Sequence, residues 1–283
     1  MIRGELVAVC VLSIILAAVL RHQGTLSQLS SAAEDKTLDG TSAADSPAVL
    51  FIGNSFTSVN DLPRTLARLT RSLGGRVFAD SYAPGGQTFE GHSKDPELLK
   101  KIQSRDWDFV VLQEQSQRPA FGQAQVEAQT ITPALRLAGL IRAAHPAAKV
   151  VFYETWGRKD GDQPNCKELP DICTYEGMQN RLDESYRLMA LRSSGLLAPV
   201  GEAWARVRAS SPSLELYSGD GIHPSTRGTY LAACVFCATL LQRGVTGAAA
   251  LGLDRREALL LQKAAEAAVF RRRVGLPAAG AGL

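Results

Sequence analysis

The sequence lacks a strong excess of charge of either sign. Its 31 Lys and Arg residues stand against 28 Asp and Glu residues, which leaves a formal net charge of +3. The basic residues are spread among acidic ones, apart from Arg271-Arg272-Arg273 near the end of a predicted helix, where the helix dipole and solvation account for cations. Because there is no basic stripe with interleaved aromatic side chains, the sequence does not indicate a nucleic-acid partner.

Cysteine is scarce as well, with five residues in the chain. Cys166 and Cys173 flank a polar loop, and we predict that they form a disulfide if the domain is extracytoplasmic. Cys234-x-x-Cys237 has the spacing of a metal or redox motif, but it lies in an apolar helical stretch without other ligands nearby. Buried free cysteine behaves as a small hydrophobic residue, so core packing is favoured. The sequence therefore predicts no metal site and no cofactor.

The chain also lacks an apolar run long enough for an ordinary transmembrane helix. The uncharged stretch from Leu6 to Leu20 would span about 22 Å as a helix, short of a hydrocarbon core of about 30 Å. This length is typical of a signal peptide or a short signal anchor, which we predict at residues 1–22, with cleavage or retention left open. Residues 23–47 are rich in Ser, Ala, Thr and Asp and predict a disordered linker. We therefore expect entry into the secretory pathway, with membrane contact only through the N-terminal segment if it is uncleaved.

From residue 48 onward, short apolar runs alternate with helix-like segments. This alternation predicts an α/β fold, a three-layer α/β/α sandwich around a central, mostly parallel five-stranded sheet. We expect one catalytic domain over residues 48–275 and a flexible tail at 276–283. The predicted strands cover residues 48–53, 76–82, 108–113, 148–154 and 196–200. The predicted helices cover residues 61–74, 95–104, 126–144, 175–193, 225–242 and 254–272.

Polar and glycine-rich residues follow four of the predicted strands. In a parallel sheet ligands bind at the carboxyl ends of the strands, so these residues should gather on one rim. They are Ser55, Gly85-Gly86, Gln113-Glu114-Gln115 and Thr155-Trp156-Gly157-Arg158.

Histidine is limited to four residues, which narrows the search for a catalytic base. His223 lies three residues after Asp220, and Ser55 lies far upstream in Gly53-Asn54-Ser55. A serine hydroxyl becomes a good nucleophile when an imidazole removes its proton and an acid holds that imidazole in the right tautomer. The other histidines are poorer bases: His22 lies in the linker and His145 at a helix end. His92 follows the glycine loop and either lines the pocket or lies in a surface loop.

Taken together, these blocks resemble the SGNH (GDSL-like) hydrolase superfamily over residues 48–243. The matching blocks are Ile52-Gly-Asn-Ser55-Phe-Thr57, Pro84-Gly-Gly86-Gln-Thr88 and Asp220-Gly-Ile-His223-Pro-Ser225. Thr57 stands where a nucleophile elbow would have its second glycine, which disfavours the α/β-hydrolase fold. The third block departs from the usual Gly-x-Asn-Asp, because Gln113-Glu-Gln115-Ser stands in its place. The chain thus looks like a poorly characterised subgroup of the superfamily.

The resemblance implies a role for each matched residue. Ser55 would be the nucleophile, His223 the base and Asp220 the residue that orients the base. The backbone N–H groups of Ser55 and Gly86 and the side-chain amide of Gln115 would form the oxyanion hole, with Gln113 as the competitor for the amide.

Five residues are further candidates for substrate contact, namely Asn54, His92, Gln113, Trp156 and Arg158. Trp156 could stack on a sugar ring or pack over the sheet edge. Arg158 could contact a substrate oxygen or pair with Asp160 or Glu154.

The function we expect is a serine esterase that hydrolyses a small carboxylic ester through an acyl-enzyme intermediate. An O-acetyl group on an extracellular carbohydrate is one such substrate, so the expected partner is a small-molecule or glycan ester. Two alternatives remain. An O-acyltransferase would use the same triad with an acceptor hydroxyl in place of water. The second alternative is a membrane-tethered glycan-binding module whose catalytic activity has been lost.

Overall fold

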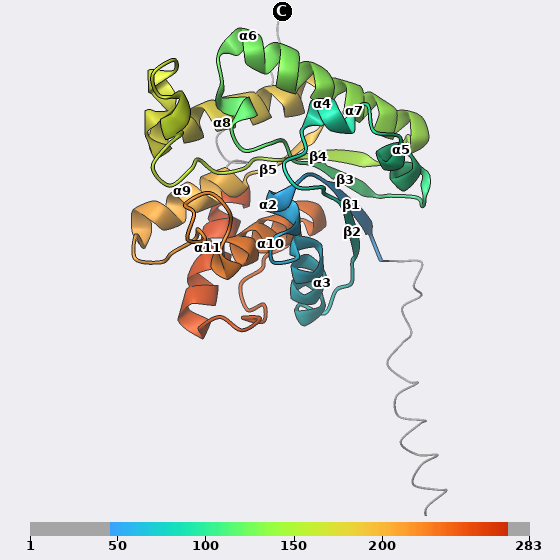
Figure 1. Cartoon of the computed structure of the whole chain (residues 1–283). Coiled ribbons are helices and arrows are strands. Elements are labelled where there is room, and N and C mark those ends of the chain that lie inside the picture. Colours follow the sequence, from blue (N-terminus) through green and yellow to red (C-terminus); the bar gives the residue numbers. More distant parts are fainter. Residues whose placement is uncertain (1–45, 271–283) are drawn as a thin grey trace, which may run out of the picture. The chain divides into compact units, whose positions relative to one another are not determined.

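In residues 46–270, which the computed structural model describes, five short strands form one parallel sheet (Figure 1). The strand order is β2-β1-β3-β4-β5, and every pairing is parallel. The α/β fold class with its five-stranded sheet is thereby confirmed. The strands are β1 (Ala48–Ile52), β2 (Phe78–Tyr82), β3 (Phe109–Leu112), β4 (Lys149–Tyr153) and β5 (Leu196–Ala198).

The central strands are apolar because both faces of the sheet are covered. All five residues of β1 and all four of β3 are buried. Successive side chains of a strand point to opposite faces, so Val49 and Phe51 enter one hydrophobic cluster while Leu50 and Ile52 enter the other. The edge strand β2 is more polar and only partly buried.

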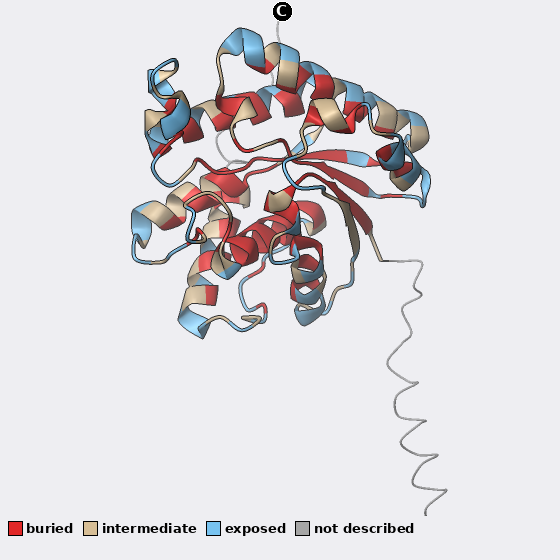
Figure 2. Cartoon of the chain, viewed as in Figure 1, coloured by how far each residue is buried: buried red, intermediate tan, exposed pale blue. Residues whose placement is uncertain are grey.

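Helices cover the sheet on both sides (Figure 1, with burial in Figure 2). One layer contains α3 (Leu62–Ser72), α9 (Val200–Ser210), α10 (Thr226–Leu241) and α11 (Arg255–Phe270). The other contains α5 (Pro96–Gln103), α6 (Gln123–Val126), the π-helical turn η3 (Glu127–Ile131), α7 (Thr132–Ala144) and α8 (Tyr175–Arg192). Cys234 and Cys237 lie fully buried in α10 as free cysteines, which is the core position expected for them.

Short helical segments occupy the loops at the ends of the strands. They are α2 (Ser55–Ser58), α4 (Phe89–His92), and the 3-10 turns η2 (Arg118–Ala120), η4 (Gln163–Asn165) and η5 (Pro170–Cys173). These loops carry the residues that we predicted at the sheet rim.

Helix α9 was absent from the sequence prediction, which ran the last strand to residue 200. The strand β5 ends at Ala198, and α9 begins at Val200, directly after Pro199. Proline has no N–H for the strand ladder, and its fixed φ suits the start of a helix. Pro199 is therefore the residue that should have ended the predicted strand.

The predicted signal segment, almost all of the linker and the C-terminal tail fall on residues 1–45 and 271–283, outside the described residues. Between residues 46 and 270, no helix is both long and apolar enough to cross a membrane.

Candidate active site

The nucleophile candidate lies in a tight turn after β1. Ser55 is the first residue of α2, and the Asn54 side chain caps this helix by accepting the Phe56 N–H at 3.2 Å. A Cβ atom on Gly53 would lie 2.4 Å from Gln113 Oε1 and 2.6 Å from Thr57 Oγ1. A side chain at position 53 would therefore displace the Gln113 and Thr57 side chains beside the Ser55 turn.

The base candidate lies in a loop that Asp220 organises. Asp220 Oδ1 accepts hydrogen bonds from the Ser218 hydroxyl at 2.7 Å and from the backbone N–H groups of Ile222 and His223, both at 2.9 Å. Gly221 adopts a φ of +69°, in the left-handed region that glycine enters without strain. The short spacing from Asp220 to His223 therefore folds the carboxylate back onto its own loop.

Ser55, His223 and Asp220 form a hydrogen-bonded series. His223 Nε2 lies 2.9 Å from Ser55 Oγ, although the two residues are 168 positions apart in the sequence. On the other side of the ring, His223 Nδ1 lies 2.5 Å from Asp220 Oδ2. With Nδ1 protonated toward the carboxylate, Nε2 can accept the serine proton.

The charge on Asp220 is well supported. Partial burial raises the pKa of the carboxyl, but the hydrogen bonds from the His223 ring, the Ile222 N–H, the Ser218 hydroxyl and the His223 N–H together hold that pKa well below its usual range. Asp220 is consequently a carboxylate at any pH near neutrality. The side chains of His223 and Asp220 are 33% and 44% exposed, so both face solvent at an open site.

Trp156 is not in a position to stack on a sugar ring. Its indole is fully buried, with Phe56 stacked at 4.7 Å between ring centroids and Trp204 stacked at 3.9 Å. Its Nε1 donates to Ile222 O at 3.0 Å. Because these two rings occupy its faces, Trp156 packs under the site, and Phe56 in turn meets the His223 ring edge to face at 5.6 Å.

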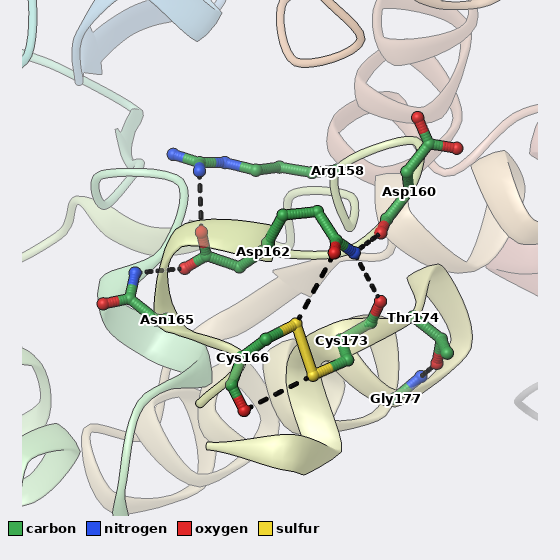
Figure 3. The surroundings of a disulfide bond; sticks show 9 residues. Arg158, Asp160, Asp162, Asn165, Cys166, Cys173, Thr174 and Gly177 are labelled. Carbon is green, nitrogen blue, oxygen red and sulfur yellow. Dashed lines mark hydrogen bonds and ion pairs between the residues drawn. A yellow bond between two sulfur atoms is a disulfide. The ribbon is translucent and has the colours of Figure 1, made fainter. Parts of the chain in front are cut away.

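Arg158 pairs with neither acid that the sequence suggested. Its Nη1 lies 2.8 Å from Asp162 Oδ1, and Asp162 is fully buried (Figure 3). Asp162 also accepts hydrogen bonds from the side-chain amides of Gln117 and Asn165. Burial lowers the pKa of the Arg158 guanidinium, while the charges of Asp162 and Asp220 oppose that shift. Contact between Arg158 and a substrate remains a prediction.

The loop after β4 that carries Asp162 also contains a disulfide between Cys166 and Cys173 (Figure 3). These are the two cysteines that we predicted to pair.

Gln113 cannot serve as the competing oxyanion donor. It is fully buried, and its Nε2 group donates both hydrogens, to Asn54 Oδ1 at 2.8 Å and to Glu114 O at 2.6 Å. Its Oε1 accepts the Asn54 N–H at 2.9 Å and the Thr57 hydroxyl at 3.0 Å. Asn54 is buried as well, and its Nδ2 donates to Gln87 O at 2.8 Å. Both residues hold the nucleophile turn instead of contacting substrate, which corrects the prediction.

Gln115 lies on the rim and is half-buried. Its Oε1 accepts the N–H groups of Gln117 at 2.8 Å and of Arg118 at 3.3 Å, and its Nε2 donates to Gln117 Oε1 at 3.2 Å. These bonds fix the orientation of the amide. Its role as the third oxyanion donor remains a prediction.

His92 is neither a pocket wall nor part of a surface loop. It is fully buried at the end of α4, with Nε2 2.8 Å from Gly53 O. Burial lowers the pKa of the imidazole, against the opposing effects of the Gly53 hydrogen bond and the Asp95 charge. His92 therefore supports the strand end that leads to Ser55.

The glycine loop ends near the nucleophile turn, since the Gln87 carbonyl is bonded to Asn54. Gly86 is exposed and adopts a φ of +69°. Within residues 46–270, neither its N–H nor that of Ser55 donates to another protein atom. In the same residues, no group of three or more His, Cys, Asp or Glu side chains is placed to hold a metal ion.

The sequence assigned no role to four residues that shape the site. Glu114 and Asp162 are buried acids that hold loops together, Trp204 stacks on Trp156, and Asn60 links the nucleophile side to the base loop. Only Glu114 carried a signal, because it lies inside the third block.

The fold and the site thus define an α/β protein with a serine, a histidine and an aspartate in hydrogen-bonded series at the sheet rim. Searches with models of protein families and among curated proteins found no match. Among solved structures, a candidate SGNH hydrolase from Slackia heliotrinireducens is 31% identical, with a TM-score of 0.57 over 69% of this chain and 100% of that one. The chain belongs to the SGNH hydrolase superfamily.

Two further solved structures support the fold. A DUF4886 family protein from Bacteroides uniformis matches with a TM-score of 0.69 at 21% identity, over 80% of this chain and 96% of that one. The lipase/acylhydrolase from Enterococcus faecalis matches with a TM-score of 0.51 at 15% identity, over 70% of this chain and 96% of that one.

Proposed function

We propose that this protein is a serine esterase that hydrolyses a small carboxylic ester through an acyl-enzyme intermediate. The observation that carries the proposal is the series of two hydrogen bonds, 2.9 Å from Ser55 Oγ to His223 Nε2 and 2.5 Å from His223 Nδ1 to Asp220 Oδ2. A neutral imidazole in this position removes the serine proton as the oxygen attacks.

The first half of the reaction forms the acyl-enzyme. Ser55 Oγ attacks the ester carbonyl carbon while His223 Nε2 takes the hydroxyl proton. The tetrahedral intermediate collapses, the bond to the alcohol oxygen breaks, and the imidazolium returns its proton to that oxygen. Asp220, ionised and hydrogen-bonded to Nδ1–H, stabilises the imidazolium while it exists.

The second half uses water in the same way. His223 removes a proton from water as the water oxygen attacks the acyl carbon, and Ser55 leaves with the proton that the ring returns. The negative oxygen of both intermediates is stabilised by the N–H groups of Ser55 and Gly86, with the Gln115 amide as the third donor. Each such donor is worth about 10²–10³ in kcat.

The substrate we propose is an O-acetyl ester or a similarly short ester on an extended molecule such as a carbohydrate. Support comes from the exposure of the acid and base, 44% for Asp220 and 33% for His223, which leaves room for a bulky alcohol part. An O-acyltransferase follows the same first half and differs only in using an acceptor hydroxyl in place of water.

The test is the hydrolysis of p-nitrophenyl acetate by the purified full-length protein beside Ser55→Ala and His223→Ala. Ser58→Ala is the matched control for the serine, because Ser58 is exposed in the same short helix. His145→Ala is the control for the histidine, because the His145 ring is outside the triad: its Nε2 lies 2.8 Å from Ile102 O and links the end of α7 to α5. We expect activity in the wild type and both controls, and a loss of at least 10³-fold in the two triad variants.

Activity that survives Ser55→Ala would overturn the proposal. Wild-type protein that folds but releases p-nitrophenol only when a sugar acceptor is added, with the acetyl group transferred to the sugar hydroxyl, would favour the acyltransferase. Carbohydrate binding without any turnover would favour the glycan-binding alternative.

A further inference from the structure

Glu114 is a buried acid that takes no part in the proposed chemistry. It follows β3, between Gln113 and Gln115, and is fully buried. Its Oε1 accepts the Phe89 N–H at 3.0 Å and the Gln115 N–H at 2.7 Å, and its Oε2 lies 3.1 Å from the same Phe89 nitrogen. The carboxyl therefore joins the third block to the first residue of α4.

Of the two residues that Glu114 joins, Phe89 follows one proposed oxyanion donor closely in the chain, and Gln115 is another. Phe89 comes three residues after Gly86, and only Gln87 and Thr88 separate them. Gln115 is itself the proposed side-chain donor. A displacement of either backbone segment would therefore move a donor relative to Ser55, and oxyanion stabilisation depends on donors being held at hydrogen-bond distance.

We propose that Glu114 is a positioning residue that fixes the glycine loop and Gln115 in the geometry of the oxyanion hole. This inference rests on the proposed esterase function. It also explains the departure of the third block from its usual form: Gln113 bonds to the nucleophile turn, and its neighbour Glu114 bonds to the glycine-loop side. Consecutive side chains of extended backbone point in opposite directions, so two adjacent residues can hold two different segments.

The surroundings of Glu114 support a structural bond over a surface ion pair. Burial raises the pKa of its carboxyl to about 8, while the N–H groups of Gln115 and Phe89 and the Arg118 charge oppose the shift and the Glu90 charge adds to it. From α8, the Tyr186 hydroxyl accepts the Glu114 backbone N–H at 3.2 Å. A buried acid that the fold keeps despite this desolvation is expected to have a specific task.

The test compares Glu114→Leu with Glu114→Gln. Leucine removes both acceptors and leaves the Phe89 and Gln115 N–H groups buried without a partner. Glutamine keeps an Oε1 atom, which already accepts both N–H groups. We expect Glu114→Leu to lower kcat for p-nitrophenyl acetate about 10–100-fold with KM changed less than about 3-fold. We expect Glu114→Gln to restore kcat to within about 5-fold of wild type.

Gln262→Leu is the matched control for lost buried hydrogen bonds. Gln262 lies in α11, is buried, and bonds to the Tyr230 hydroxyl, to Ala248 O and to the Gly247 N–H. We expect this variant to lose thermal stability as Glu114→Leu does, but to keep wild-type kcat. If both leucine variants lost kcat equally, or if Glu114→Leu kept it, the positioning role would be wrong.

Amide hydrogen exchange separates this inference from the proposed function. We expect exchange over residues 84–92 to be faster in Glu114→Leu than in wild type, and unchanged in Gln262→Leu. This readout needs no catalytic activity. Faster local exchange in a protein without esterase activity would support the link and overturn the proposed function, whereas unchanged exchange would overturn the link.

Discussion

Replacing Asp220 by asparagine tests whether the acid sets the tautomer of the base. The Asn Oδ1 can still accept the N–H groups of Ile222 and His223, so the loop should keep its fold. At the other position an NH₂ group replaces the oxygen that lies 2.5 Å from His223 Nδ1. Nδ1 must then accept a hydrogen bond, which moves the ring proton to Nε2. A protonated Nε2 cannot take the proton of Ser55.

The size of the effect follows from the exposure of the pair. In a buried serine-protease triad the same change lowers kcat by about 10⁴. Asp220 is 44% exposed and His223 33% exposed, so water can satisfy the ring in either tautomer and soften the penalty. We therefore expect a smaller loss in kcat, about 10²–10³-fold, which corresponds to about 2.7–4.1 kcal/mol of transition-state stabilisation.

The assay is the initial rate of p-nitrophenyl acetate hydrolysis as a function of substrate concentration, with Asp160→Asn as the control. Asp160 is an exposed acid in the neighbouring loop. KM should change little in either variant, and the thermal midpoint should change little in Asp160→Asn. An Asp220→Asn protein with wild-type kcat would refute the reasoning, because the carboxylate would then have no part in setting the proton position.

Three further perturbations have distinct expected results. Asn60 has a left-handed φ of 59°, and its Nδ2 donates to Pro224 O at 3.0 Å and to Thr229 Oγ1 at 3.1 Å. Glycine tolerates this φ but loses both hydrogen bonds, so Asn60→Gly should lower kcat severalfold with a small loss of thermal stability, and unchanged kcat would show that the link is dispensable. Trp156→Ala removes a buried indole stacked on both faces and should reduce the free energy of unfolding by about 3–5 kcal/mol in urea titrations, against which a loss below about 1 kcal/mol would argue. Acid should destabilise the fold through Asp220, because the pKa of its carboxyl is lowered on folding. The stability that Asp220 contributes is present above its unfolded pKa of about 3.9 and is lost as pH falls below that value toward the folded pKa. The urea midpoint of Asp220→Asn should therefore vary less between pH 6 and pH 3 than that of wild type.

The fold was predictable because its strongest signals are local. Residues 48–52 and 109–112 are continuous apolar runs, which are typical of strands covered on both faces of a sheet. The order of the strands in the sheet has no such local signal, since it depends on which elements pack together. Of the helices that the prediction missed between residues 46 and 270, the longest, α9, begins beside a proline that the strand prediction overran.

The catalytic candidates were predictable for a different reason. With four histidines in the chain, few residues can be the base, and the Asp-x-x-His pair combined with a serine after the first predicted strand resembles the SGNH blocks. The direction of each supporting side chain is set by tertiary packing, and the sequence does not contain it. Trp156 illustrates the point: its place at the end of β4 is compatible with stacking on a sugar, but Trp204, from the unpredicted helix α9, covers one of its faces.

The corrections also narrow where substrate specificity can arise. Asn54, His92, Gln113 and Trp156 are buried and hold the nucleophile turn or the base loop, so they are not free to recognise an alcohol or acyl group. Of the predicted rim residues beside the triad, Gly86 and Gln115 are left as donors and Arg158 as a half-buried cation. Arg158 and Gln115 are connected through Gln117 and through Asp162, which lies in the same loop after β4 as the disulfide. Because the network ties that loop to a proposed oxyanion donor, a change in the loop that alters substrate preference should also alter kcat.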